Sequence, residues 1–97
     1  MAYLGFAYFV QGDSQKIIEL GQQALTVGRE NKSSVAEFFG LLALSIGYGN
    51  LGNYEKALEM SQASLAITRD PKFQRRIPDG EQLALNIVGS LYREVGG

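Results

Sequence analysis

Apolar residues recur three and four positions apart along this chain, with polar residues between them. Ile17, Leu20, Ala24 and Val27 show this spacing, which is typical of one face of an amphipathic α-helix. No segment shows the sustained alternation of apolar and polar residues that marks a half-buried strand. The pattern therefore predicts an all-α protein.

Turn residues divide this pattern into separate helices. Gly12 and Gly52 each follow an apolar stretch, where glycine often ends a helix. Both prolines, Pro71 and Pro78, fall within residues 70–78, so we expect that segment to be irregular and the helices unbroken.

Capping residues indicate where the helices begin. Asp13 and Asn53 are suitable N-caps, and two pairs have capping-box spacing, Ser34 with Glu37 and Asp79 with Gln82. Five helices are expected, at about residues 2–11, 14–30, 34–51, 54–69 and 79–95. The short links between most of them predict antiparallel neighbours.

The chain also repeats itself. Eight identical pairs are 40 residues apart: Leu4/Leu44, Tyr8/Tyr48, Gly12/Gly52, Lys16/Lys56, Glu19/Glu59, Gln22/Gln62, Leu25/Leu65 and Arg29/Arg69. A shorter third copy places Leu85, Gly89, Tyr92 and Gly96 44 residues after Leu41, Ser45, Tyr48 and Gly52. A period of roughly 20–50 residues indicates a solenoid, in which each unit buries its apolar face against its neighbour.

The middle copy carries the fullest motif: Leu44, Ser45, Tyr48, Gly52, Tyr54, Ala57, Leu58, Ser61, Ser64 and Leu65. The first copy matches it at Leu4, Gly5, Tyr8, Gly12, Ala24 and Leu25, and the third at Leu85, Gly89, Leu91, Tyr92 and Gly96. These units resemble the tetratricopeptide repeat (TPR), in its form of about 40 residues. The resemblance implies antiparallel helical hairpins stacked as a right-handed α-solenoid of roughly two and a half repeats.

A single TPR-like domain is therefore expected over residues 1–97, with repeats at about 1–32 and 33–72 and a partial one at about 79–97. Both ends of the repeat pattern are incomplete, so we expect a piece of a longer array. The small residues Gly5, Ser45 and Gly89 should let helices approach closely, while Tyr8, Tyr48 and Tyr92 fill the space beside them. Ala57 should be buried where two helices cross.

Composition argues against catalysis. The 97 residues include no cysteine and no histidine, which removes thiolate metal sites and the commonest general base. Gly47, Gly49 and Gly52 imitate a dinucleotide-binding fingerprint, but no strand precedes them. We expect no enzyme activity, cofactor or metal site.

Charge and hydropathy limit the partners. A net charge of −1 gives no field for nucleic acid, and no apolar run reaches the length of a membrane span. The apolar segment Met1–Val10 also lacks the basic leader and the cleavage site of a signal peptide, so we expect a cytoplasmic protein. The local basic run Lys72, Arg75 and Arg76 is interpreted as a solvated loop, with contact to an anion such as a partner's acidic tail as the alternative.

In TPR proteins the first helix of each unit lines the concave binding face. By resemblance, the candidate ligand-binding residues here are Phe6, Phe9, Ile46, Asn50, Asn86, Ser90 and Arg93. The leading hypothesis is a non-catalytic scaffold that binds a peptide or partner domain in this groove. Two alternatives stay open: self-association through exposed repeat ends, which the apolar segment 2–10 favours, and a peptide- or metabolite-sensing domain of a larger signalling protein.

Overall fold

The computed structural model describes residues 14–96, and this part of the chain is all-α. Its five helices are α2 (Ser14–Glu30), α3 (Ser34–Asn50), α4 (Tyr54–Ile67), α5 (Pro71–Arg76) and α6 (Gly80–Gly96). They hold about 85% of the described residues, and none of these residues forms a strand. The predicted all-α class is thus confirmed, while the helix expected at 2–11 lies outside the described residues.

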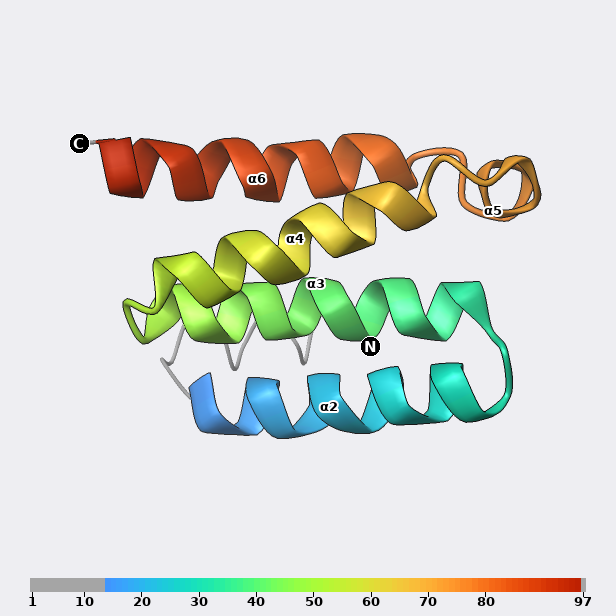
Figure 1. The fold of residues 1–97 in the computed structure, drawn as a ribbon, viewed down its shortest axis with the longest axis horizontal. Coiled ribbons are helices and arrows are strands. Elements are labelled where there is room, and N and C mark those ends of the chain that lie inside the picture. Colours follow the sequence, from blue (N-terminus) through green and yellow to red (C-terminus); the bar gives the residue numbers. More distant parts are fainter. Residues whose placement is uncertain (1–13, 97) are drawn as a thin grey trace.

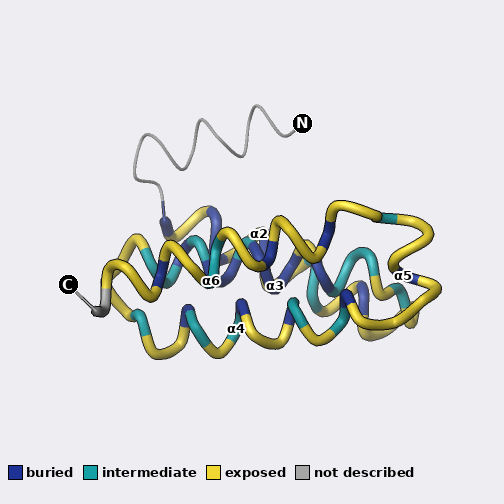
Figure 2. Tube along the Cα trace, turned by 90° about the horizontal axis from the view of Figure 1, so that it is seen from above, coloured by how far each residue is buried: buried dark blue, intermediate teal, exposed yellow. Residues whose placement is uncertain are grey.

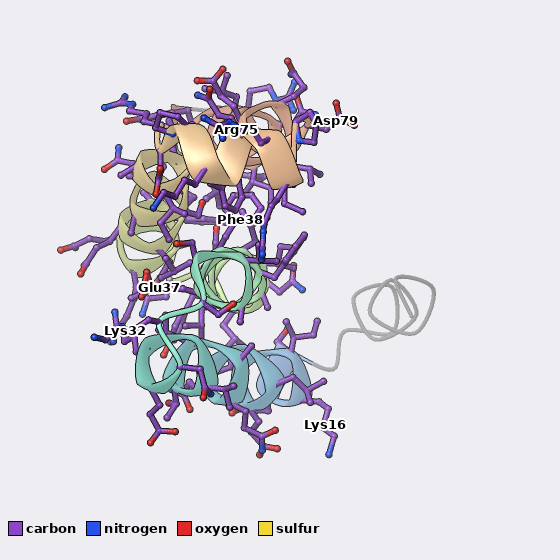
Figure 3. All side chains as sticks on the ribbon, turned by 90° about the vertical axis from the view of Figure 1, so that its right-hand side faces the viewer. Lys16, Lys32, Glu37, Phe38, Arg75 and Asp79 are labelled. Carbon is purple, nitrogen blue, oxygen red and sulfur yellow. The ribbon has the colours of Figure 1, made fainter. Side chains whose placement is uncertain are left out.

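α3 is the central helix of the bundle. It packs against α2 on one side and against α4 and α6 on the other, and α4 also contacts α6 (Figures 1 and 3). The long helices that follow one another in sequence run antiparallel, so α6 runs in the same direction as α3. Buried positions lie mainly where the helices face one another (Figure 2).

The caps place most helix boundaries close to the predicted ones. The Asn53 side chain accepts a hydrogen bond from the Lys56 backbone N–H at 3.3 Å, as expected of an N-cap. At the start of α3 the prediction is wrong by one residue, because Ser33 rather than Ser34 is the N-cap. The Ser33 hydroxyl accepts from the Ala36 N–H, and the Glu37 carboxylate instead meets Arg29 at 3.7 Å.

The segment 70–78, expected to be irregular, contains the short helix α5. Asp70 caps this helix by accepting a hydrogen bond from the Lys72 backbone N–H at 3.0 Å. Pro71 occupies the first helical position, where its missing N–H costs nothing and its fixed φ is favourable. The prediction of a wholly irregular segment is therefore wrong. Proline is unfavourable inside a helix but favourable at its first position.

Glycines let α2 and α3 approach until their backbones are close. A Cβ on Gly40 would lie 2.6 Å from the Leu25 backbone nitrogen and 2.9 Å from the Gly21 carbonyl oxygen. A Cβ on Gly28 would lie 2.6 Å from the Glu37 backbone nitrogen. All three distances are below 3.0 Å, which is closer than a Cβ atom can approach a backbone atom. Any side chain at Gly28 or Gly40 would therefore push the two helices apart.

Small residues also let α4 lie close to its neighbouring helices. Its buried positions are Ala57, Ser61 and Ser64, followed by Thr68 just after the helix. The three hydroxyls donate to the backbone carbonyls three residues earlier, at 3.0, 2.6 and 2.6 Å, so they are buried without being left unsatisfied. Ala57 is fully buried, as predicted.

Larger apolar side chains close the bundle near α5. Phe38, Leu42, Phe73 and Ala84 form one buried cluster, in which the rings of Phe38 and Phe73 have centroids 4.8 Å apart. Phe73 therefore anchors α5 to the core.

Gly89 and Tyr92 do not pack as their counterparts Ser45 and Tyr48 do, and that prediction is wrong. Ser45 is fully buried, whereas Gly89 is exposed and a Cβ there would meet nothing within 4 Å. Tyr92 is 52% exposed, with its hydroxyl accepting a hydrogen bond from Gln62. The reason is that no described helix covers this face of α6.

Two glycine substitutions test this packing. Gly40→Ala should lower the free energy of unfolding by about 1–3 kcal/mol because it overpacks the α2–α3 contact. Gly89→Ala, the matched control, should raise it by about 0.5–1 kcal/mol, since alanine stabilises an open helix interior. Urea denaturation followed by circular dichroism measures both. Equal effects of the two substitutions would contradict the described packing.

Candidate binding groove

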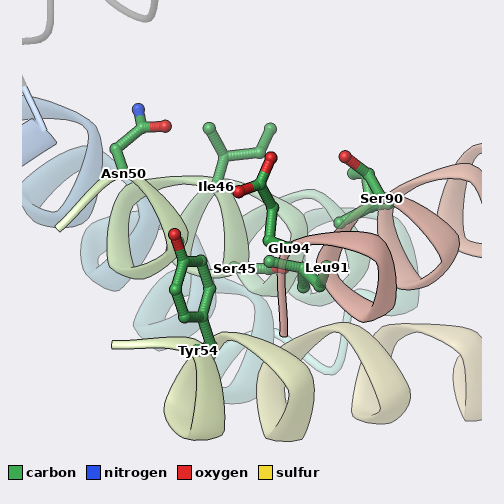
Figure 4. A pocket seen from close by; sticks show the side chains of 9 residues that line it. Ser45, Ile46, Asn50, Tyr54, Ser90, Leu91 and Glu94 are labelled. Atoms are coloured by element: carbon green, nitrogen blue, oxygen red, sulfur yellow. The ribbon is translucent and has the colours of Figure 1, made fainter. Parts of the chain in front are cut away.

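A hollow of about 420 Å³ lies where α3, α4 and α6 meet (Figure 4). α3 contributes Ser45, Ile46, Gly49 and Asn50 to it, α4 contributes Tyr54, and α6 contributes Ile87, Ser90, Leu91 and Glu94. We call this hollow the α3–α6 groove.

The inner part of the groove is built by small residues of α3 that receive a leucine of α6. A Cβ on Gly49 would lie 3.1 Å from Leu91 Cδ2, so glycine leaves the space that Leu91 occupies. Ser45 is fully buried, and its hydroxyl has no hydrogen-bond partner among the described residues. An unsatisfied buried hydroxyl costs about 1–3 kcal/mol. The inner part of the groove is therefore apolar, apart from one unpaired polar atom.

The rim of the groove is polar. Asn50, Ser90 and Glu94 are exposed and Tyr54 is half-buried, and their polar groups extend toward the same side of the groove (Figure 4). Glu94 is the only charged lining residue, and it forms no ion pair with another described residue. The rim thus offers hydrogen-bonding groups and one unpaired negative charge.

A shallower hollow over the start of α4 continues this surface. It shares Tyr54 and Glu94 with the α3–α6 groove and adds Glu55, with no lysine or arginine among its lining residues. Glu55, like Glu94, forms no ion pair within residues 14–96. The acidic character therefore extends along the surface beyond the groove itself.

The structure brings together three of the seven predicted site residues. Ile46, Asn50 and Ser90 line the α3–α6 groove, while Phe6 and Phe9 lie outside the described residues. Asn86 and Arg93 are exposed on α6 but do not line the groove. Asn86 instead accepts a hydrogen bond from Gln82 at 3.0 Å.

Helical geometry explains this division of α6. Ile87, Ser90, Leu91 and Glu94 are spaced three and four apart and share the face toward the groove, whereas Asn86 and Arg93 are seven apart on a different face. Glu94 was missed, although it lies 44 residues after Asn50 and the repeat spacing alone could have found it. Tyr54 was missed because only the first helix of each unit was considered.

Among the described residues, no group of histidine, cysteine, aspartate and glutamate is placed to hold a metal ion. No helix within residues 14–96 is long and apolar enough to cross a membrane. No family model, curated protein or solved structure matches this chain.

Proposed function

We propose that this protein is a non-catalytic interaction module that binds a peptide or a partner domain in the α3–α6 groove. The observation that carries the proposal is the groove itself: an apolar interior beside a rim of hydrogen-bonding side chains. That combination is typical of sites in which apolar contacts give affinity and a few polar groups fix orientation.

A TPR-like solenoid is the architecture that we propose for the module. It is supported by the 40-residue repeat and by a bundle in which α3 contacts the antiparallel α4 and the parallel α6. In such a stack, successive first helices share one face. The α3–α6 groove lies between two of these helices.

The negative charge at the rim of the groove indicates which kind of peptide would bind there. The predicted site residue Arg93 does not line the groove, whereas Glu94 does. A peptide that places a lysine or arginine beside Glu94 can form a charge-assisted hydrogen bond, which is stronger than a neutral one. The Asn50 amide can pair with the peptide backbone as both donor and acceptor.

A peptide-display selection tests this function. Random peptides selected on the immobilised full chain should be enriched in a basic residue next to an apolar one. Calorimetry with a selected peptide should show that Asn50→Ala and Glu94→Gln each weaken binding by about 1–2 kcal/mol, the usual effect of removing one polar group from an interface.

Two matched substitutions outside the groove serve as controls. Asn86→Ala removes an exposed amide from α6, and Glu59→Gln removes an exposed carboxylate from α4. Neither should change the affinity by more than about 0.5 kcal/mol. A larger effect for these controls than for the groove variants would show that the site is assigned to the wrong face.

Self-association is a second candidate function, and the bare face of α6 favours it. Leu41 and Ser45 are buried on α3, but their counterparts Leu85 and Gly89 are exposed on α6 beside Tyr92. We propose that a second copy of the chain covers this face. Such packing would give α6 the neighbour that α3 already has.

Sedimentation velocity at about 100 µM tests this second candidate. The wild-type chain should sediment as a dimer, and Leu85→Gln should shift it toward monomer because it places a polar amide in the apolar interface. Leu83→Gln is the control, since Leu83 is similarly exposed on a different face of α6. A monomeric wild-type chain at this concentration would exclude the proposed dimer.

A further inference from the structure

A second hollow, of about 400 Å³, lies at the opposite end of the bundle from the α3–α6 groove, between α5 and the turn that joins α2 to α3 (Figures 1 and 3). Three cationic residues line it: Lys32 from the turn, and Lys72 and Arg76 from α5. Ser33, Ser34 and Asp70 lie beside them. We call this hollow the basic hollow.

The fold holds the backbones of these cations in place. Lys32 adopts a left-handed conformation with φ of +53°, within a turn closed by a 2.7 Å hydrogen bond from the Ser33 N–H to the Gly28 carbonyl. Lys72 and Arg76 are four residues apart on α5, so they share one face of that helix. The buried Phe73 ring fixes α5 against the core. Residues about 40 positions apart in sequence are thereby placed around one cavity.

These positive charges are not neutralised within the described part of the protein. Lys32, Lys72 and Arg76 are all exposed, and none forms an ion pair with another described residue. Asp70 is the acidic residue in the lining, and its carboxylate accepts a hydrogen bond from the Lys72 backbone N–H. The mutual repulsion of like charges around the cavity would be relieved by a bound anion.

We propose that the basic hollow binds an acidic segment of a partner protein, independently of the α3–α6 groove. Two glutamates or aspartates in an extended segment can pair with cations on both sides of the cavity, and Arg76 can hold one carboxylate bidentately. The nearby Ser33 and Ser34 hydroxyls can also donate to a carboxylate.

The acidic residues that adjoin these cations in the sequence favour protein carboxylates over a nucleic acid as the ligand. Glu30, Asp70 and Asp79 lie close in sequence to the three cations, and the whole chain carries a net charge of −1. A nucleic acid backbone needs a continuous basic surface along its phosphates. Separate carboxylates of a peptide can pair with the three cations without being placed next to the protein's own acidic residues.

A fluorescein-labelled decaglutamate peptide is the probe for this site. Fluorescence anisotropy with the full chain at low ionic strength should show saturable binding that weakens as salt is added. The triple variant Lys32→Gln, Lys72→Gln, Arg76→Gln should bind the peptide at least about ten-fold more weakly, since each lost exposed ion pair contributes a factor of roughly two to five.

A triple variant at the other end of the bundle gives the matched control. Lys16→Gln, Lys56→Gln, Arg93→Gln removes the same number of positive charges, and the peptide affinity should fall by less than about two-fold. Circular dichroism should show that both variants remain folded, because all six side chains are exposed.

Three results would overturn the proposal. One is an equal loss of affinity in both triple variants, which would show that the binding depends only on the net charge of the protein. Another is tighter binding of a labelled decathymidylate than of decaglutamate, which would indicate a nucleic acid site. The third is displacement of the peptide by inorganic phosphate at micromolar concentration, which would indicate a site for a small phosphorylated ligand.

Discussion

The close approach of neighbouring helices to α3 is the constraint on which the rest of this structure depends. From Phe38 to Asn50 this helix carries no charged residue, and it contacts α2, α4 and α6. Gly40 and Gly47 face α2, while Gly49 faces Leu91 of α6 and Ala57 of α4. A helix surrounded in this way must be apolar on several sides and must carry small residues where neighbours come closest.

The groove follows from how α4 is placed against this central helix. The small buried residues of α4 bring it close to its neighbours, and α4 crosses the bundle obliquely (Figure 1). It approaches α6 most closely near α5 and is farther from it at the other end, where Tyr54 and Glu94 lie. The site and the core therefore have one structural origin, which is the distribution of small residues on α3 and α4.

Local signals predicted most of the fold. The position of the α3–α4 turn was predicted from Gly52 and Asn53, because caps and turns depend on only a few neighbouring residues. Pro71 was misinterpreted because a proline is common both after the end of a helix and at the first position of one. Only Asp70 before it, which is the N-cap, and the buried Phe73 after it indicate that a helix begins here. The sequence equally predicted Ala57 at a helix crossing, where it is buried.

The groove was less predictable, because burial depends on neighbours that a repeat pattern does not specify. Ser45 and Gly89 occupy equivalent positions, yet one is buried and the other exposed. Ile46, Asn50 and Ser90 were found from the first helices of the units, but Tyr54 comes from a second helix and Glu94 required the 44-residue spacing. The sequence indicated Lys72 and Arg76 as part of a basic run that could contact an anion, but it could not show that Lys32 lines the same hollow, which depends on the tertiary fold.

Native-state hydrogen exchange measures the central role of α3 most directly. If α3 organises the bundle, its amides from Phe38 to Gly47 should exchange only on global unfolding, with a protection free energy equal to that of unfolding by urea. The amides of α5 and of the last turns of α6 should exchange through smaller openings. Exchange of the α3 amides through local openings, at rates similar to those of α6, would contradict the account.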